Sequence, residues 1–80
     1  MSEAERVQTE IQRVIGDDPT IHDANKILVM VEKKSIWKGG KEVVILKGRV
    51  HDESDKTKAH HIAELHAGGR QVEDSITVVH

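Results

Sequence analysis

The residues with the clearest chemical character in this sequence gather around its single tryptophan. Trp37 is the only aromatic side chain in 80 residues, and it stands among lysines beside the pair Gly39-Gly40. An indole near ammonium groups is typical of a membrane interface, where the ring lies at headgroup depth and each lysine contributes about 1 kcal/mol on an anionic surface. We therefore expect a lipid- or partner-binding segment made of Lys33, Lys34, Ile36, Trp37, Lys38 and Lys41.

Two other interpretations of this lysine-rich segment stay open. Its tip could contact a protein instead of a lipid. Alternatively, Trp37 packs back onto its own sheet, and the lysines prevent an exposed strand edge from pairing with another chain. Four lysines against two glutamates give only a weak attraction to an anionic surface, so membrane binding would require a second contact or oligomerisation.

The six histidines and the acidic pairs indicate neither a metal site nor an enzyme. His60 and His61 are adjacent and His66 is five positions further on, so no pair has the spacing of ligands on one helix face, and there is no cysteine. The other histidines fall in loops or at the chain end. The carboxylates of Asp17-Asp18 and Asp52-Glu53 have loop and cap positions, with no nucleophile and base beside them. We expect no metal, no cofactor and no catalytic residue.

Two helices are predicted among the elements that position these residues. The segment from Ser2 to Glu5 fits a capping box at the start of the first helix, and Gly16 predicts its end. Asp52 or Ser54 is the expected N-cap of the second helix, which Gly68-Gly69 stops. Each helix shows one apolar stripe at helical spacing, so each is expected to cover a sheet.

Three strands are predicted at residues 26–36, 42–50 and 71–79, from their branched residues and alternating pattern. The paired glycines at 39–40 suit the turn of a hairpin between the first two strands. The element order α-β-β-α-β predicts an α+β fold, with two helices packed on one face of a three-stranded sheet. Whether the third strand pairs with the first or the second stays open. The expected core is Val7, Ile11, Val29, Val31, Val44, Leu46, Ile62, Ile76 and Val78.

A second candidate surface follows from strand alternation, because neighbouring side chains in a strand point to opposite faces. Four apolar residues fall in the phase opposite to the core and are expected to form a self-association or partner face: Leu28, Met30, Val43 and Ile45. Soluble monomers seldom expose such patches. We expect a partner protein, another domain or a weak homodimer to cover this face, the alternative being cover by the N-terminal residues.

Charge and length narrow the function further. The net charge of -2 hides a basic middle third, where residues 26–50 contain seven basic and two acidic residues. The element order also occurs in KH-like nucleic-acid-binding domains, but the phosphate-clamping Gly-x-x-Gly loop between helices is missing. Residues 1–80 are expected to form a single domain. With no signal sequence, a complete chain would be cytoplasmic, whereas an excised domain would be periplasmic or membrane-associated.

Several strings, in order and in register, resemble the BON domain, named for bacterial osmotically inducible and nodulation-associated proteins. They are Asp18-Pro19-Thr20-Ile21, the strand from Lys26 to Val31, the Val44 to Val50 string, Ala59 with Ile62-Ala63 and Gly68, and the closing strand from Val72 to Val78. The resemblance runs from Val7 through nearly the whole chain. It implies a non-enzymatic module, stress-related in many bacteria, that attaches to a phospholipid membrane or an envelope protein. Nucleic-acid binding, or protein assembly without lipid contact, is the alternative.

The chain departs from the family pattern at three places. The hairpin between Val31 and Val44 is longer than the family's short turn, and the extra length carries the tryptophan and most of the lysines. His66 and Gly69 stand where apolar residues are usual. The outward strand positions, commonly polar in the family, are apolar here. The first and third departures coincide with the two candidate surfaces.

Overall fold

The computed structural model describes residues 2–33 and 41–80. Its elements are α1 (Glu3–Asp17), a short 3-10 helix η1 (Ala24–Lys26), β1 (Ile27–Lys33), β2 (Glu42–Val50), α2 (Glu53–His66) and β3 (Gln71–Val78). Apart from η1, this is the predicted order α-β-β-α-β. Of the expected lysine-rich segment, only Lys33 and Lys41 are described, and Lys34, Ile36, Trp37 and Lys38 lie outside the described residues.

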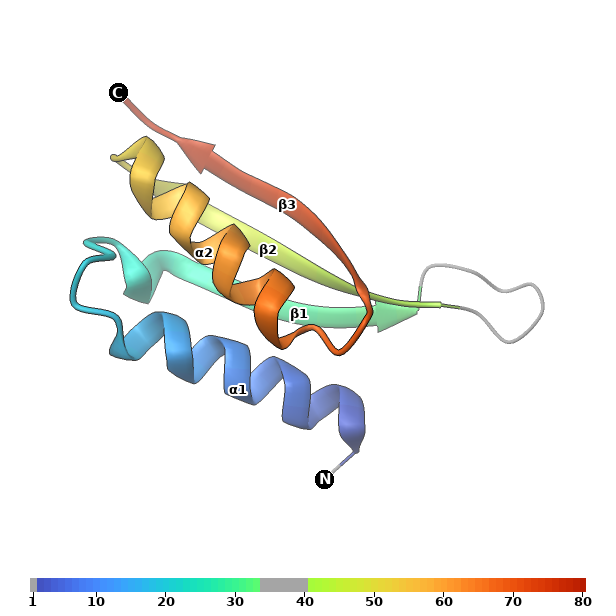
Figure 1. The fold of residues 1–80 in the computed structure, drawn as a ribbon. Coiled ribbons are helices and arrows are strands. Elements are labelled where there is room, and N and C mark those ends of the chain that lie inside the picture. The colour runs from blue at the N-terminus through green and yellow to red at the C-terminus, as the bar shows by residue number, and fades with distance from the viewer. Residues whose placement is uncertain (1, 34–40) are drawn as a thin grey trace.

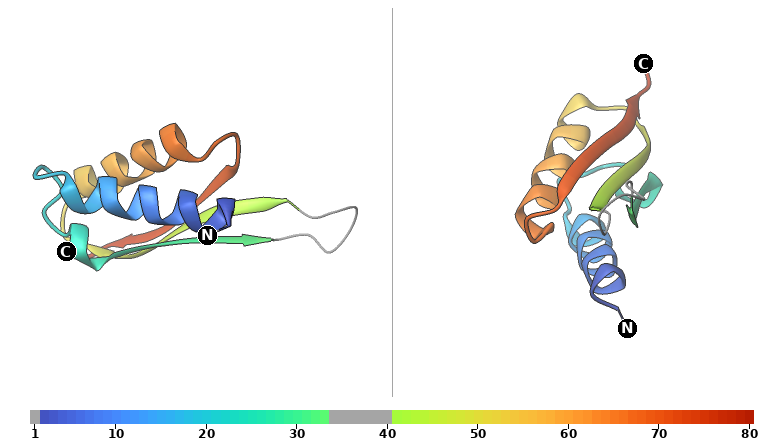
Figure 2. Two further views of the ribbon diagram at one scale, coloured as in Figure 1. Left: turned by 90° about the horizontal axis from the view of Figure 1, so that it is seen from below. Right: turned by 90° about the vertical axis from the view of Figure 1, so that its right-hand side faces the viewer.

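The three strands form one mixed sheet in the order β1-β2-β3. β1 pairs with β2 antiparallel, and β3 pairs with β2 parallel, so β2 is the central strand. The sequence had left open which strand β3 would pair with. α2 connects the two parallel strands. Both helices lie on one face of the sheet and neither covers the other face (Figures 1 and 2).

α1 begins where the sequence predicts and ends one residue later. Ser2 is the N-cap, and its Oγ accepts a hydrogen bond from the backbone N–H of Glu5 at 3.1 Å. The helix includes Gly16 and stops after Asp17, whereas Gly16 was the expected end. A glycine only weakens a helix, but the residue before a proline is pushed into extended backbone. Asp18, which precedes Pro19, has φ -84° and ψ 109°, so the proline determines the end.

Gln12 fastens α1 to the edge strand β1, although a polar residue on a helix gave no reason to expect this. Its side-chain Nε2 donates to the Ile27 carbonyl at 2.8 Å. Its Oε1 accepts from the Val29 N–H at 3.0 Å. The amide therefore satisfies backbone groups at the free edge of β1 and blocks part of that edge from pairing with another strand.

The core lies between the helices and the sheet, as predicted. Val7, Ile11, Val29, Val44, Leu46 and Ile76 are buried in it. Val31, Ile62 and Val78 were also predicted to point inward. They are partly buried and pack against this cluster. α2 contributes mainly small side chains, because Ala59 and Ala63 are fully buried, as is Ala67 at its C-cap. Alanine lets the helix axis approach the sheet closely.

Gly48 permits a close approach between strands. It pairs with Ile27 at the start of β1 and has φ +139°, a conformation that other residues rarely adopt. A Cβ atom there would come within 2.1 Å of the Lys26 carbonyl oxygen. The close neighbour of Gly48 is therefore the backbone that enters β1.

Candidate functional site

The sheet face without helices carries the four apolar residues expected there, but they differ in exposure. Val43 and Ile45 lie outside the core cluster, in the phase opposite to Val44 and Leu46. They are nevertheless 7% and 3% exposed. Both belong to the central strand, which has neighbouring side chains on both sides. Of the four, Leu28 alone is largely exposed, at 52%, and Met30 is half-buried.

Two basic residues extend this face toward the end of β2. Lys47 and Arg49 are exposed and share the strand phase of Val43 and Ile45. Lys47 pairs with Leu28 across the strands. We call Leu28, Met30, Lys47 and Arg49 the outer patch. On the β3 side its neighbours are the uncharged, exposed Ser75 and Thr77. Lys47 and Arg49 were not predicted as part of this surface, although their strand phase relative to Ile45 was the available signal.

The base of the hairpin lies at the other end of the sheet. Lys33 and Lys41 are exposed there and line one hollow. Arg70 also lines it, but its guanidinium binds Glu42, with Nη2 2.8 Å and Nε 2.9 Å from Oε1. Because this ion pair neutralises Arg70, the two lysines supply the free positive charge among the described residues of the hollow.

A second hollow lies along α2 and contains His60. Its Nδ1 is 3.1 Å from a carboxylate oxygen of Asp74, and its Nε2 is 3.3 Å from one of Glu64. Asp74 also accepts a hydrogen bond from the Ile76 N–H. These contacts tie α2 to β3. Thr57 supplies a hydroxyl to the lining of this hollow, and its Oγ1 donates to the Glu53 carbonyl at 3.2 Å.

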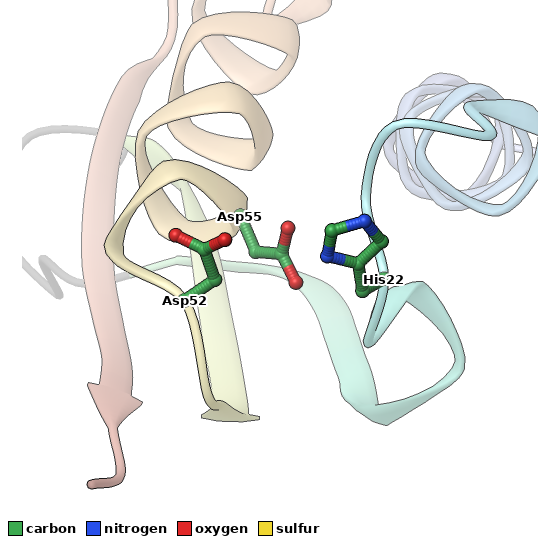
Figure 3. A group of neighbouring side chains, drawn as sticks. All are labelled: His22, Asp52 and Asp55. Carbon is green, nitrogen blue, oxygen red and sulfur yellow. The ribbon is translucent and has the colours of Figure 1, made fainter.

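A third group was not predicted and combines residues far apart in the chain. His22 comes from the loop before η1, and Asp52 and Asp55 come from the start of α2 (Figure 3). One potential ligand atom from each residue lies within 4.8 Å of the others. Asp52 is the N-cap of α2, as one of the two predicted candidates, and accepts from the Ser54 N–H at 3.0 Å. The histidine spacing considered in the sequence could not reveal this group.

Hydrogen bonds join the same loop to the turn before α2. Asp23 Oδ2 accepts from the His51 N–H at 2.9 Å and contacts its ring Nδ1 at 3.0 Å. These bonds from His51 lower the pKa of Asp23 below its ordinary value. The backbone N–H and hydroxyl of Ser54 likewise lower the pKa of Asp52. Both side chains are therefore carboxylates at neutral pH.

Comparison with known protein families gives one match. A model described as BON domain matches residues 38–80, which is more than half of the chain and includes β2, α2 and β3. The matched stretch is shorter than the resemblance, which began at Val7. A search of curated proteins finds no match. No helix among the described residues combines the length and apolar character needed to cross a membrane.

Proposed function

Because this chain belongs to the BON domain family, we propose that it attaches to an anionic phospholipid surface through the open face of its sheet. The family comprises non-enzymatic binding modules with which phospholipid binding is associated.

The observation that carries the proposal is the composition of the outer patch. Leu28 keeps half of its surface in water, next to the exposed cations of Lys47 and Arg49. An apolar side chain among basic ones fits the boundary between headgroups and acyl chains of an anionic bilayer. Each basic residue near that surface contributes about 1 kcal/mol. The acidic Glu32 and Glu73, which pair with Val43 and Ile45 on the same face, oppose this attraction, so we expect modest affinity that decreases with salt.

The base of the hairpin provides a second contact. Lys33 and Lys41 are exposed at the opposite end of β2 from Arg49. Lys33 has the strand phase of Val29 and Val31, which face the helices, so Lys41 is the described lysine that this end contributes to the open face. In this proposal the sheet lies flat on the membrane, with basic residues at both ends and the apolar residues between them. Trp37, Lys34, Ile36 and Lys38 belong to the contact as the sequence analysis defined it, although they lie outside the described residues.

Vesicle binding tests this function directly. Wild-type protein should sediment with phosphatidylglycerol vesicles, remain in solution with phosphatidylcholine vesicles, and be released by added salt. Fluorescence reports on a single site because Trp37 is the only tryptophan. Its emission should shift to the blue with the anionic vesicles only, and Trp37→Ala and Lys38→Glu should each weaken sedimentation while the circular dichroism spectrum is retained.

A negative result in the vesicle experiment would separate the remaining candidate partners. Absence of binding to anionic vesicles at low salt would refute lipid attachment. Sedimentation equilibrium on the free protein would then ask whether the outer patch joins two copies. A heavier species that Leu28→Glu returns to monomer would favour the weak homodimer, whereas a strict monomer would leave an envelope protein as the partner.

A further inference from the structure

A buried carboxylate oxygen without a hydrogen-bond partner lies where the loop after α1 meets the start of α2. Asp55 is 0% exposed. Its Oδ2 accepts a hydrogen bond from the backbone N–H of Asp23 at 3.1 Å. Its Oδ1 is buried and has no partner among the described residues. An ionised oxygen in such a position is costly unless a proton, a water or a cation satisfies it.

Two further ligand-type side chains face this carboxylate. In Figure 3 the carboxylate of Asp55 lies between that of Asp52 and the imidazole of His22. One ligand atom from each of the three lies within 4.8 Å of the others. His22 and Asp52 are exposed, so an ion can reach the group from solution. We propose that His22, Asp52 and Asp55 together bind one divalent transition-metal cation, for which Zn²⁺ is the best match.

The donor atoms determine this choice of cation. An imidazole nitrogen suits Zn²⁺ and its transition-metal neighbours, whereas Mg²⁺ and Ca²⁺ prefer six or more oxygen ligands. Two carboxylates and one histidine supply three ligands, and water completes a tetrahedral site. Ligands about 2.1 Å from a tetrahedral ion lie about 3.4 Å apart. The group must therefore contract around the buried Asp55, mainly by rotation of the exposed His22, because Asp52 is held by the hydrogen bond from the Ser54 N–H.

Binding at this position would tie two segments of the chain together. Asp23 already bonds to His51 and to Asp55, so the loop before η1 is held against the turn before α2. A cation adds a third link and offsets the repulsion between the two carboxylates. Because only the folded chain brings the three residues together, the ion should raise the unfolding temperature. This effect does not require the lipid contact, which involves the other face of the sheet.

Two measurements test this site. Calorimetric titration of metal-free protein with Zn²⁺ gives the affinity and the number of ions bound, and thermal unfolding gives the change in stability. We expect one ion per chain and an unfolding temperature that rises with Zn²⁺ but not with equal Mg²⁺ or Ca²⁺. His22→Ala should lower the affinity at least about tenfold and remove the rise, as expected for loss of one of three ligands. Asp52→Asn should act in the same direction while it retains a helix cap, since Asn caps as well as Asp. His61→Ala is the matched control, because His61 is exposed on α2 and outside the group.

Three outcomes would overturn the proposal. They are no binding of Zn²⁺ to the wild-type chain, wild-type affinity in His22→Ala, and loss of affinity in His61→Ala alone. The first would leave a water or a proton as the partner of Asp55, and the others would place the ion on different histidines. Should His22→Ala fail to fold, the imidazole nitrogen resonances of the wild-type protein decide. Zn²⁺ should shift those of His22, and a shift of the other histidines alone would refute the site.

Discussion

Leu28→Glu tests whether the outer patch is the surface that contacts lipid. Leu28 is 52% exposed, so about half of its side chain remains to be buried on binding. Full burial of a leucine contributes about 1.5–3 kcal/mol, and half of that corresponds to a roughly 4- to 13-fold change in partitioning. The introduced charge adds about 1 kcal/mol of repulsion on an anionic surface. We expect binding to phosphatidylglycerol vesicles to weaken by about 20- to 70-fold.

Leu65→Glu provides the matched control for this change. Leu65 is 67% exposed on α2, in the helical layer, so the substitution makes the same change in charge and size away from the outer patch. Screening over a Debye length of about 10 Å should keep its effect below about twofold. Leu28→Ala separates the two contributions, since it loses apolar contact without adding charge. Equal binding of Leu28→Glu and Leu65→Glu in vesicle sedimentation, with both variants folded, would refute the assignment.

Three further predictions concern stability and use urea or acid unfolding followed by circular dichroism. Leu46→Ala removes a fully buried side chain of the central strand and should cost about 2–5 kcal/mol, and a loss below about 1 kcal/mol would contradict the core assignment. Gly48→Ala should cost at least about 3 kcal/mol of stability, because its Cβ would overlap the Lys26 carbonyl oxygen and the backbone would be strained. Gly16→Ala in α1 is the matched change, because a Cβ there meets nothing within 4 Å. It should stabilise the protein by about 0.4–1 kcal/mol. Side-chain and backbone hydrogen bonds from Thr20 lower the pKa of Asp18 below its ordinary 3.8, so their contribution to stability is present above that pH and lost as the pH falls through the lowered pKa. Asp18→Asn should therefore lose less stability than wild type between pH 5 and pH 2, and parallel acid profiles would contradict this.

Local sequence signals predicted the elements of the fold because each depends on neighbours in the chain. The second strand of the predicted hairpin has the observed bounds of β2, Glu42–Val50, and Ser2 was correctly predicted as the cap of α1. Exposure on the open face was harder to predict. The phase of Ile45 was right, but its 3% exposure depends on β2 being the central strand. That position follows from the parallel pairing of β3, a long-range contact that no local pattern encodes.

The polar residues that join different elements were the least predictable part of the molecule. Gln12 has the appearance of a surface residue in sequence, yet its amide bonds the edge of β1. Asp55 occupies the first turn of α2, where acidic residues are common because of the helix dipole, so nothing suggested complete burial. His22 meets it only because the loop after α1 folds back against α2. Such groups depend on three-dimensional proximity between segments about 30 residues apart, and sequence spacing carries no signal of it.

The outer patch and the His22 group are connected through the start of β1. Leu28 lies opposite Lys47 only if β1 enters the sheet in its observed register. That register depends on the tight contact at Gly48 and on the bonds of Asp23 to the turn before α2. Both contacts fix backbone at one end of the sheet, whereas the hydrophobic core alone would tolerate small displacements of an edge strand. A substitution that lengthens the contact at Gly48 or the hydrogen bond between Asp23 and His51 should therefore change the spacing of apolar and basic groups on the outer patch before it unfolds the chain.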